Sequence, residues 1–186
     1  MKKIWFVVMV LLVFVNCETP EPQKVFTGDK QFRTTDPSRL RFLNVRAAYY
    51  YRERPQHTKL DIYKLRKFSS GKDKPVLAPV IVNNWMKDEA YLFFENNTYP
   101  YFKDTITIKW IEETDSTTNS GFYELALKTK HDQYEFGGKL YESIQKGHDL
   151  FLKNTKNEFV PIYDNGKERS AFRTTIRDYY RLTEVY

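Results

Sequence analysis

Cysteine is nearly absent from this chain of 186 residues, which contains Cys17 and no second one. A single cysteine excludes a disulfide within the chain. Glycine is scarce as well, with seven residues, and the sequence contains neither a glycine-rich phosphate-binding loop nor the Gly-x-Ser-x-Gly turn of a serine hydrolase. The stability of the folded part must therefore come from packing, and 14 Tyr, 14 Phe and 3 Trp supply large side chains for it.

Histidine is also rare, and the three present give no catalytic or metal-binding pattern. His131 and His148 are each followed by Asp, but neighbouring residues point to different sides of a helix or strand. His131 and Glu135 can share a helical face, yet no second His or Cys lies nearby to complete a metal site. We therefore interpret all three, His57 included, as surface residues, and expect no metal and no cofactor. A pair of carboxylates that meets only in the fold remains an alternative.

The N-terminal segment has the layout of a secretory signal. Lys2 and Lys3 precede an uninterrupted apolar run over residues 4–15. As a helix this run would be about 18 Å long, against a hydrocarbon core of about 30 Å, so it is too short to remain as a membrane span. We predict that residues 1–16 are a signal peptide and that the protein is exported.

The apolar run ends at Phe14-Val15-Asn16-Cys17, and this ending resembles the lipobox of bacterial lipoproteins. The resemblance implies that Cys17 is acylated, that the signal is cut just before it, and that the protein is anchored in the cell envelope, at the outer membrane. Phe14 and Asn16 stand where lipoboxes usually carry Leu and a small residue. A plain signal peptide with an incidental cysteine is the alternative. Asp115-Ser116-Thr117 resembles the short O-glycosylation acceptor pattern of Bacteroidota.

The polar, proline-containing sequence after Cys17 predicts a tether over residues 17–38, followed by a single domain over 39–186. The formal charge of the whole chain is +6, and loss of Lys2 and Lys3 with the signal lowers it to about +4. This modest basicity fits contact with anionic lipid, polysaccharide or protein. We expect no nucleic-acid partner outside the cytoplasm, and the sequence contains no motif for one.

Alternation of apolar and polar residues predicts strands over much of the segment from 43 to 129. The expected strands and apolar runs are 43–52, 59–68, 76–82, 90–95, 105–113 and 122–129, the last two forming an antiparallel hairpin. No regular alternation of strands with helices occurs in this part, which disfavours a doubly wound parallel sheet.

The pattern changes after residue 130. Phe136, Leu140 and Ile144 recur at helical spacing before Gly147. Short strands are expected at 150–152 and 159–163, with Pro161 favouring an edge position for the second, and a closing helix at 168–182. The predicted fold is therefore α+β, with a mostly antiparallel sheet of about six to eight strands and two late helices packed on one face.

Four arginines recur every fourth residue in the closing helix, namely Arg169, Arg173, Arg177 and Arg181. At about 100° per residue they spread over roughly 120° of the helix surface. Guanidinium groups bind carboxylates and phosphates well, so the stripe is a candidate contact for an anionic partner. The alternative is a solvated face that pairs with Glu168, Asp178 and other acids.

Aromatic residues on or near expected loops form the second candidate contact. They are Tyr50, Trp85, Tyr99 and Tyr101, accompanied by the basic residues Arg46 and Arg52. Aromatic rings anchor protein partners and stack on sugars at a low entropic cost. Core packing is the alternative for each of them.

These features favour a non-enzymatic envelope lipoprotein that acts by contact, as an accessory subunit or as a binder of a peptide or glycan partner. Two other classes stay open: an envelope hydrolase that acts on glycan or peptide, and a structural tether between envelope layers. The mature domain resembles no family that its motifs identify.

Overall fold

A computed structural model describes residues 29–68, 75–96, 105–114, 116–126, 129–154 and 156–185. The fold is α+β, as the sequence predicts, and the described residues form two antiparallel sheets of four strands each. The first sheet has the order β1(Tyr50–Glu53), β2(Leu60–Leu65), β3(Leu77–Asn84) and β4(Glu89–Asn96). The second has the order β6(Thr118–Ala126), β5(Thr105–Glu113), β7(Asp149–Lys153) and β8(Phe159–Ile162).

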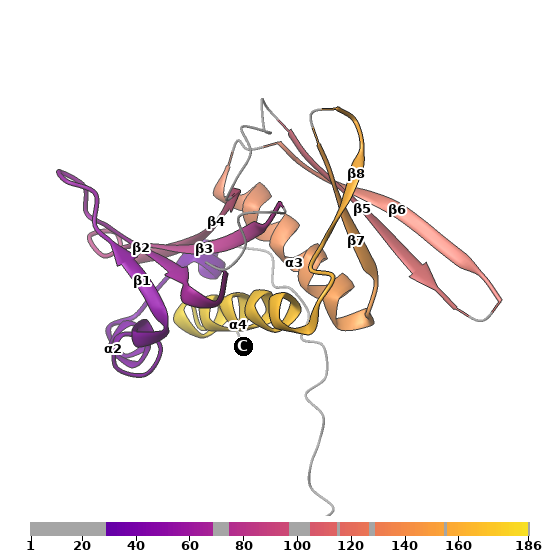
Figure 1. Ribbon diagram of the computed structural model, residues 1–186. Helices are drawn as coiled ribbons and strands as arrows, with labels where there is room; N and C mark the ends of the chain where they lie inside the picture. The colour runs from indigo at the N-terminus through magenta and orange to yellow at the C-terminus, as the bar shows by residue number, and fades with distance from the viewer. Residues whose placement is uncertain are drawn as a thin grey trace, which may run out of the picture.

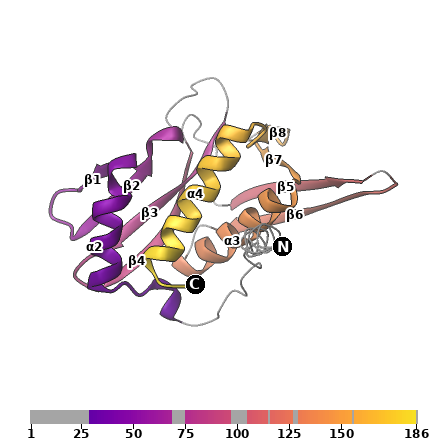
Figure 2. The same ribbon diagram turned by 90° about the horizontal axis from the view of Figure 1, so that it is seen from below.

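Within the described residues, three α-helices lie along one side of these sheets (Figure 1, Figure 2). They are α2(Asp36–Val45), α3(Lys130–Lys146) and α4(Gly166–Leu182). Figure 1 shows α4 beneath the first sheet and α3 between the two sheets, and Figure 2 shows α4 lying between α2 and α3. The two late helices therefore pack against the sheets, as predicted.

Local sequence signals explain where these helices begin and end. Thr129 caps α3 in a capping box with Asp132, and Gly147 ends the helix in the left-handed region at φ 83°. Asn165 caps α4 by accepting a hydrogen bond from the backbone N–H of Glu168. Gly137 lets α3 approach β4 closely, because a Cβ there would lie 3.1 Å from a methyl carbon of Leu92.

One core unites the helices and both sheets. Phe172, Ile176 and Tyr179 of α4 are buried, as their helical spacing predicts, and they meet residues from α3, β3 and β4. The strands β5 and β6 form the predicted hairpin, with Ile106 opposite Leu125. β8, which contains Pro161, lies at the edge of its sheet as expected, because proline cannot donate a ladder hydrogen bond.

The strand predicted over 43–52 is wrong for most of its length. Residues 36–45 form α2, residues 47–49 a short 3₁₀ helix η3(Ala47–Tyr49), and only Tyr50 to Glu53 enter the sheet. Thr35 caps α2 in a capping box with Ser38, and Pro37 lies in the first turn, where its missing N–H costs nothing. Only Ser38 and Phe42 of this helix are buried, so its sequence carries no helical hydrophobic period.

The segment before α2, which we expected to belong to the tether, packs against the domain. Gln31 and Phe32 are buried in a short 3₁₀ helix η2(Asp29–Phe32), and the Phe32 ring lies edge-on to Tyr134 of α3. The hydroxyl of Tyr179 donates a hydrogen bond of 2.8 Å to the carbonyl of Gln31. Part of the expected tether therefore belongs to the core.

Candidate functional site

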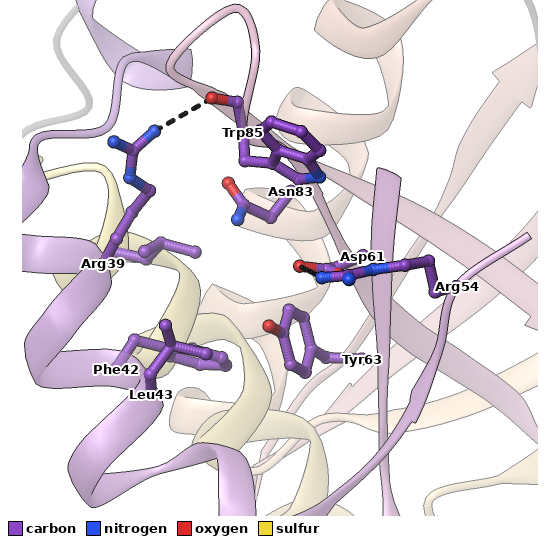
Figure 3. A pocket seen from close by; sticks show the side chains of 9 residues that line it. Arg39, Phe42, Leu43, Arg54, Asp61, Tyr63, Asn83 and Trp85 are labelled. Carbon is purple, nitrogen blue, oxygen red and sulfur yellow. Dashed lines mark hydrogen bonds and ion pairs between the residues drawn. The ribbon is translucent and has the colours of Figure 1, made fainter. Parts of the chain in front are cut away.

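A pocket of about 290 Å³ lies between α2, the first sheet and the turn that joins β3 to β4. Figure 3 shows its side chains, which come from four parts of the chain. They belong to α2, to β2 and the connection before it, to β3 and the turn after it, and to the end of α4. The lining residues are Arg39, Phe42, Leu43, Arg54, Asp61, Tyr63, Asn83, Trp85 and Leu182. We call this the α2–β3 pocket.

Strand register brings its polar groups together. Asp61 of β2 is paired with Asn83 of β3, so their side chains stand side by side on one face of the sheet. Tyr63 follows Asp61 by two residues and therefore projects from the same face. In Figure 3 the Asp61 carboxylate, the Tyr63 hydroxyl and the Asn83 carboxamide point toward the α2 side of the pocket.

Two of these polar groups have unused hydrogen-bonding capacity. Tyr63 is 0% exposed and Asn83 is 7% exposed, and within the described residues neither Tyr63 Oη nor Asn83 Oδ1 has a hydrogen-bond partner. Both oxygens are covered by the surrounding side chains, so they lie behind the pocket wall and are not open to a group bound in the pocket. Gln133 and Tyr134 also carry unpaired buried oxygens, but they do not line this pocket.

The third polar group, Asp61, is fully engaged. Arg54 donates hydrogen bonds of 2.8 and 3.2 Å to its two carboxylate oxygens, and Arg52 donates one of 2.8 Å. Burial opposes ionisation of Asp61, but the hydrogen bonds from Arg54 and Arg52 outweigh it and hold its pKa below the ordinary value. Asp61 is therefore a charged acceptor near neutral pH and a poor source of protons.

Arg39 closes the α2 side of the pocket. Its guanidinium pairs with Asp36 and Asp88 and donates a hydrogen bond of 3.3 Å to the carbonyl of Trp85. These contacts join α2 to the β3–β4 turn and fix the position of the Trp85 backbone. The pocket therefore has a wall whose charges are already paired.

Exposed apolar side chains lie at the pocket and beside it. Leu43 and Trp85 line it, Leu40 and Met86 are near them in the chain, and all four expose more than a third of their surface; we call these four residues the rim. A second hollow, lined by Asp36, Pro37, Arg39, Leu40 and Leu43, continues along α2. Exposed apolar side chains that surround a polar pocket are typical of contact surfaces.

The aromatic residues predicted as ligand contacts have three different outcomes. Trp85 lies at the pocket mouth, where Lys59 Nζ is 5.4 Å from the centroid of its ring. Tyr50 is wrong as a ligand contact, because it is buried and its hydroxyl donates a hydrogen bond of 2.7 Å to Asp178. Tyr99 and Tyr101 lie outside the described residues. A ligand role for Trp85 stays a prediction.

Sequence reasoning missed Asp61, Tyr63 and Asn83. Asp61 and Tyr63 lie in the expected strand 59–68, where alternation places both on one face, but Asn83 falls just beyond the expected apolar run 76–82. Single polar residues in strands are common, and only the register shows that Asp61 and Asn83 are partners. The α2 side of the pocket was missed for a second reason, because no helix was predicted there and the last three residues of α2 were assigned to a strand.

The four arginines of α4 do not form one continuous stripe. Arg169 is turned inward, where it donates hydrogen bonds of 2.8 Å to the carbonyls of Tyr163 and His148. Arg173, Arg177 and Arg181 are exposed. Asp178, named as an alternative partner, is buried and pairs with Arg46 of the α2–β1 connection at 2.9 Å. An anionic contact at the three outer arginines stays a prediction.

The interpretation of His148 as a surface residue is wrong. It is buried, its Nδ1 lies 3.2 Å from Ser143 Oγ, and its Nε2 lies 3.5 Å from a Glu112 oxygen. Ser, His and an acid thus meet, but Ser143 is buried and its hydroxyl is also hydrogen-bonded to Tyr123 at 2.8 Å. These contacts link the C-terminal part of α3 to the second sheet, and none of the three residues lines the α2–β3 pocket.

The remaining candidates concern metal and membrane. His131 and Glu135 do meet, at 3.1 Å, as their helical spacing suggests. In the part of the chain that the structure describes, no group of three metal-ligating side chains forms, and no helix is long and apolar enough to cross a bilayer. Cys17 and the apolar run before it lie outside that part.

Comparison of the chain with protein-family models, with curated proteins and with solved structures yields no match.

Proposed function

We propose that this chain is an envelope lipoprotein that acts by contact, and that the α2–β3 pocket with its rim is its binding surface. The observation that carries the proposal is the exposed apolar surface at this pocket: Leu43 and Trp85 line it, and Leu40 and Met86 lie beside them in the chain. Binding sites of this kind combine apolar walls with a few polar groups that orient the bound group.

The rim supports a contact role for the same surface. Trp85 is an exposed aromatic residue of this rim, which also includes Leu40, Leu43 and Met86. Tryptophan is among the residues that contribute most to binding energy at interfaces. A partner that covers this rim would remove exposed apolar area from water.

The chemistry of the pocket supports binding more than hydrolysis. Its one carboxylate, Asp61, is held ionised by two arginines, whereas a general acid needs a raised pKa. None of the residues that line it is a histidine, a serine or a cysteine. The residues at hand are suited to hold a group in place.

The test is recovery of partners from detergent-solubilised envelopes with Trp85→Ala, compared with Phe159→Ala. The two aromatic residues are matched in exposure, 41% and 39%, but Phe159 lies on β8, away from the pocket. We expect Trp85→Ala to lower the recovery of bound protein or glycan at least tenfold, as loss of an interface anchor does, and Phe159→Ala to leave it unchanged. Equal recovery with both variants would contradict the proposal.

A further inference from the structure

We infer that helix α4 docks the domain on a bilayer, with the exposed arginines Arg173, Arg177 and Arg181 on the phosphate groups of anionic phospholipids. We call these three residues the arginine face. The inference rests on the proposed function, because the bilayer in question is the one that holds the lipid on Cys17. The supporting observations are the charge of the helix surface, the contrast with helix α3, and the place where the chain enters the domain.

The exposed surface of α4 carries charge of one sign. All of its exposed side chains are basic, namely those of Lys167, Arg173, Arg177 and Arg181. The two acids of the helix lie elsewhere, because Asp178 is buried against Arg46 and Glu168 is about 180° around the helix from the middle of the arginine face. Figure 2 shows no described helix or strand in front of α4. This surface is therefore open to a large anionic partner.

The neighbouring helix α3 has a different kind of surface. Its exposed residues carry both signs, and Lys146 pairs with Glu142 one turn away at 2.6 Å. On α4, in contrast, neither Arg173 nor Arg181 has an ion-pair partner within the described residues. The surface of α3 therefore neutralises itself, whereas that of α4 attracts anions.

The spacing of the arginines fits a plane of phosphates better than a single small anion. Arg173 and Arg181 are eight residues apart, which is about 12 Å along the helix axis. Guanidinium groups separated in this way do not converge on one anion, but each can donate two parallel hydrogen bonds to a different phosphate. A bilayer presents such phosphates side by side, and juxtamembrane basic residues are attracted to anionic lipids.

The chain enters the domain at the C-terminal end of α4. The hydroxyl of Tyr179 donates a hydrogen bond of 2.8 Å to the carbonyl of Gln31, two residues after the first described residue, Asp29. From Cys17 to Asp29 the chain can span at most about 40 Å. An anchor at Cys17 would therefore keep α4 near the bilayer at all times. Docking is then intramolecular, so a modest attraction is sufficient.

The experiment is fluorescence quenching on the full-length protein, purified in detergent and reconstituted into vesicles that contain a spin-labelled headgroup as a short-range quencher. Ser170→Cys places the fluorophore beside the arginine face. We expect quenching in vesicles of phosphatidylcholine mixed with phosphatidylglycerol, and much less in phosphatidylcholine alone. In about 1 M salt, where the Debye length is about 3 Å, the difference should disappear. Equal quenching in the two kinds of vesicle would overturn the inference.

A matched pair of double variants tests the residues. Arg173→Gln with Arg181→Gln should lower the ratio of docked to undocked protein about 20-fold, because each basic residue near an anionic surface contributes about fivefold. Lys153→Gln with Lys156→Gln removes the same charge from β7 and the turn after it, and should leave the ratio unchanged. Equal quenching with both variants, or a large fall in melting temperature for the arginine variant alone, would contradict the arginine face as a docking surface.

Flotation of the vesicles keeps this inference distinct from the proposed function. If the protein floats with phosphatidylcholine vesicles but shows no lipid-dependent quenching, the anchor stands and the docking inference is wrong. If it floats with neither kind of vesicle, both are wrong. If it floats only with anionic vesicles, and only while Arg173 and Arg181 are present, the docking surface stands without a lipid anchor. Partner recovery with Trp85→Ala is measured separately from all three results.

Discussion

Replacing Asp178 with alanine is expected to lower the free energy of unfolding by about 3–5 kcal/mol. The Asp178 carboxylate is buried in α4, where it accepts hydrogen bonds from Arg46 Nε at 2.9 Å and from Tyr50 Oη at 2.7 Å. Its removal leaves a half-buried guanidinium and a buried hydroxyl without their partner. A thermal melt should show a shift of roughly 6–20 °C for a domain of this size.

Two variants control this result. Asp149→Ala removes an exposed carboxylate that pairs with Arg169 at 3.3 Å, and it should change stability by less than about 1 kcal/mol. Asp178→Leu combined with Arg46→Met replaces the buried pair with apolar groups, and it should recover most of the loss. An unchanged melt for Asp178→Ala would mean that this pair does not hold α2 and β1 against α4.

The second large effect is expected at Cys17. Cys17→Ser should abolish fatty-acid incorporation and release the protein from membranes in a carbonate wash. Each buried CH₂ group of an acyl chain contributes about 0.8 kcal/mol, and stable anchoring takes more than one chain. The measurement is fractionation of cells labelled with a radioactive fatty acid.

Asn16→Gly is the matched variant, because it changes the neighbouring residue toward the usual lipobox and keeps the thiol. It should remain labelled and membrane-bound. Retention of Cys17→Ser in the washed membranes would contradict the lipid anchor and leave a plain export signal as the better interpretation of residues 1–16.

The second half of the chain could be predicted closely from its sequence. Phe136, Leu140 and Ile144 mark α3, Gly147 ends it, and Phe172, Ile176 and Tyr179 mark α4, because each helix buries one continuous face. The alternation over 105–113 matches β5 to the residue, since Ile106 and Ile108 are buried while their neighbours in the strand are less so. Local pattern and tertiary packing agree in these elements.

The first part could not be predicted in the same way. Helix α2 buries only Ser38 and Phe42, so its sequence shows no helical hydrophobic period. The capping box at Thr35 and Ser38 was the better signal for this helix. The division of the strands into two sheets also cannot be predicted from local sequence. It depends on the pairing of β5 with β7, which are separated in the chain by β6 and α3.

The candidate site was predictable in one residue, Trp85, whose aromatic ring lies on an expected turn. The other pocket residues become a site only through tertiary structure: strand register joins Asp61 to Asn83, and α2 supplies the apolar wall. The inward turn of Arg169 likewise depends on carbonyls of Tyr163 and His148 that the sequence does not place near it.

The most direct test of the contact function is site-specific photo-crosslinking in intact cells. A photoreactive phenylalanine replaces Met86 at the pocket rim or, as control, Phe122 on β6, and both positions are more than half exposed. We predict that Met86 yields a discrete adduct with a protein or glycan, that Trp85→Ala removes this adduct, and that Phe122 does not yield it. An adduct that forms equally from Phe122, or that survives Trp85→Ala unchanged, would contradict the assignment of the α2–β3 pocket as the binding surface.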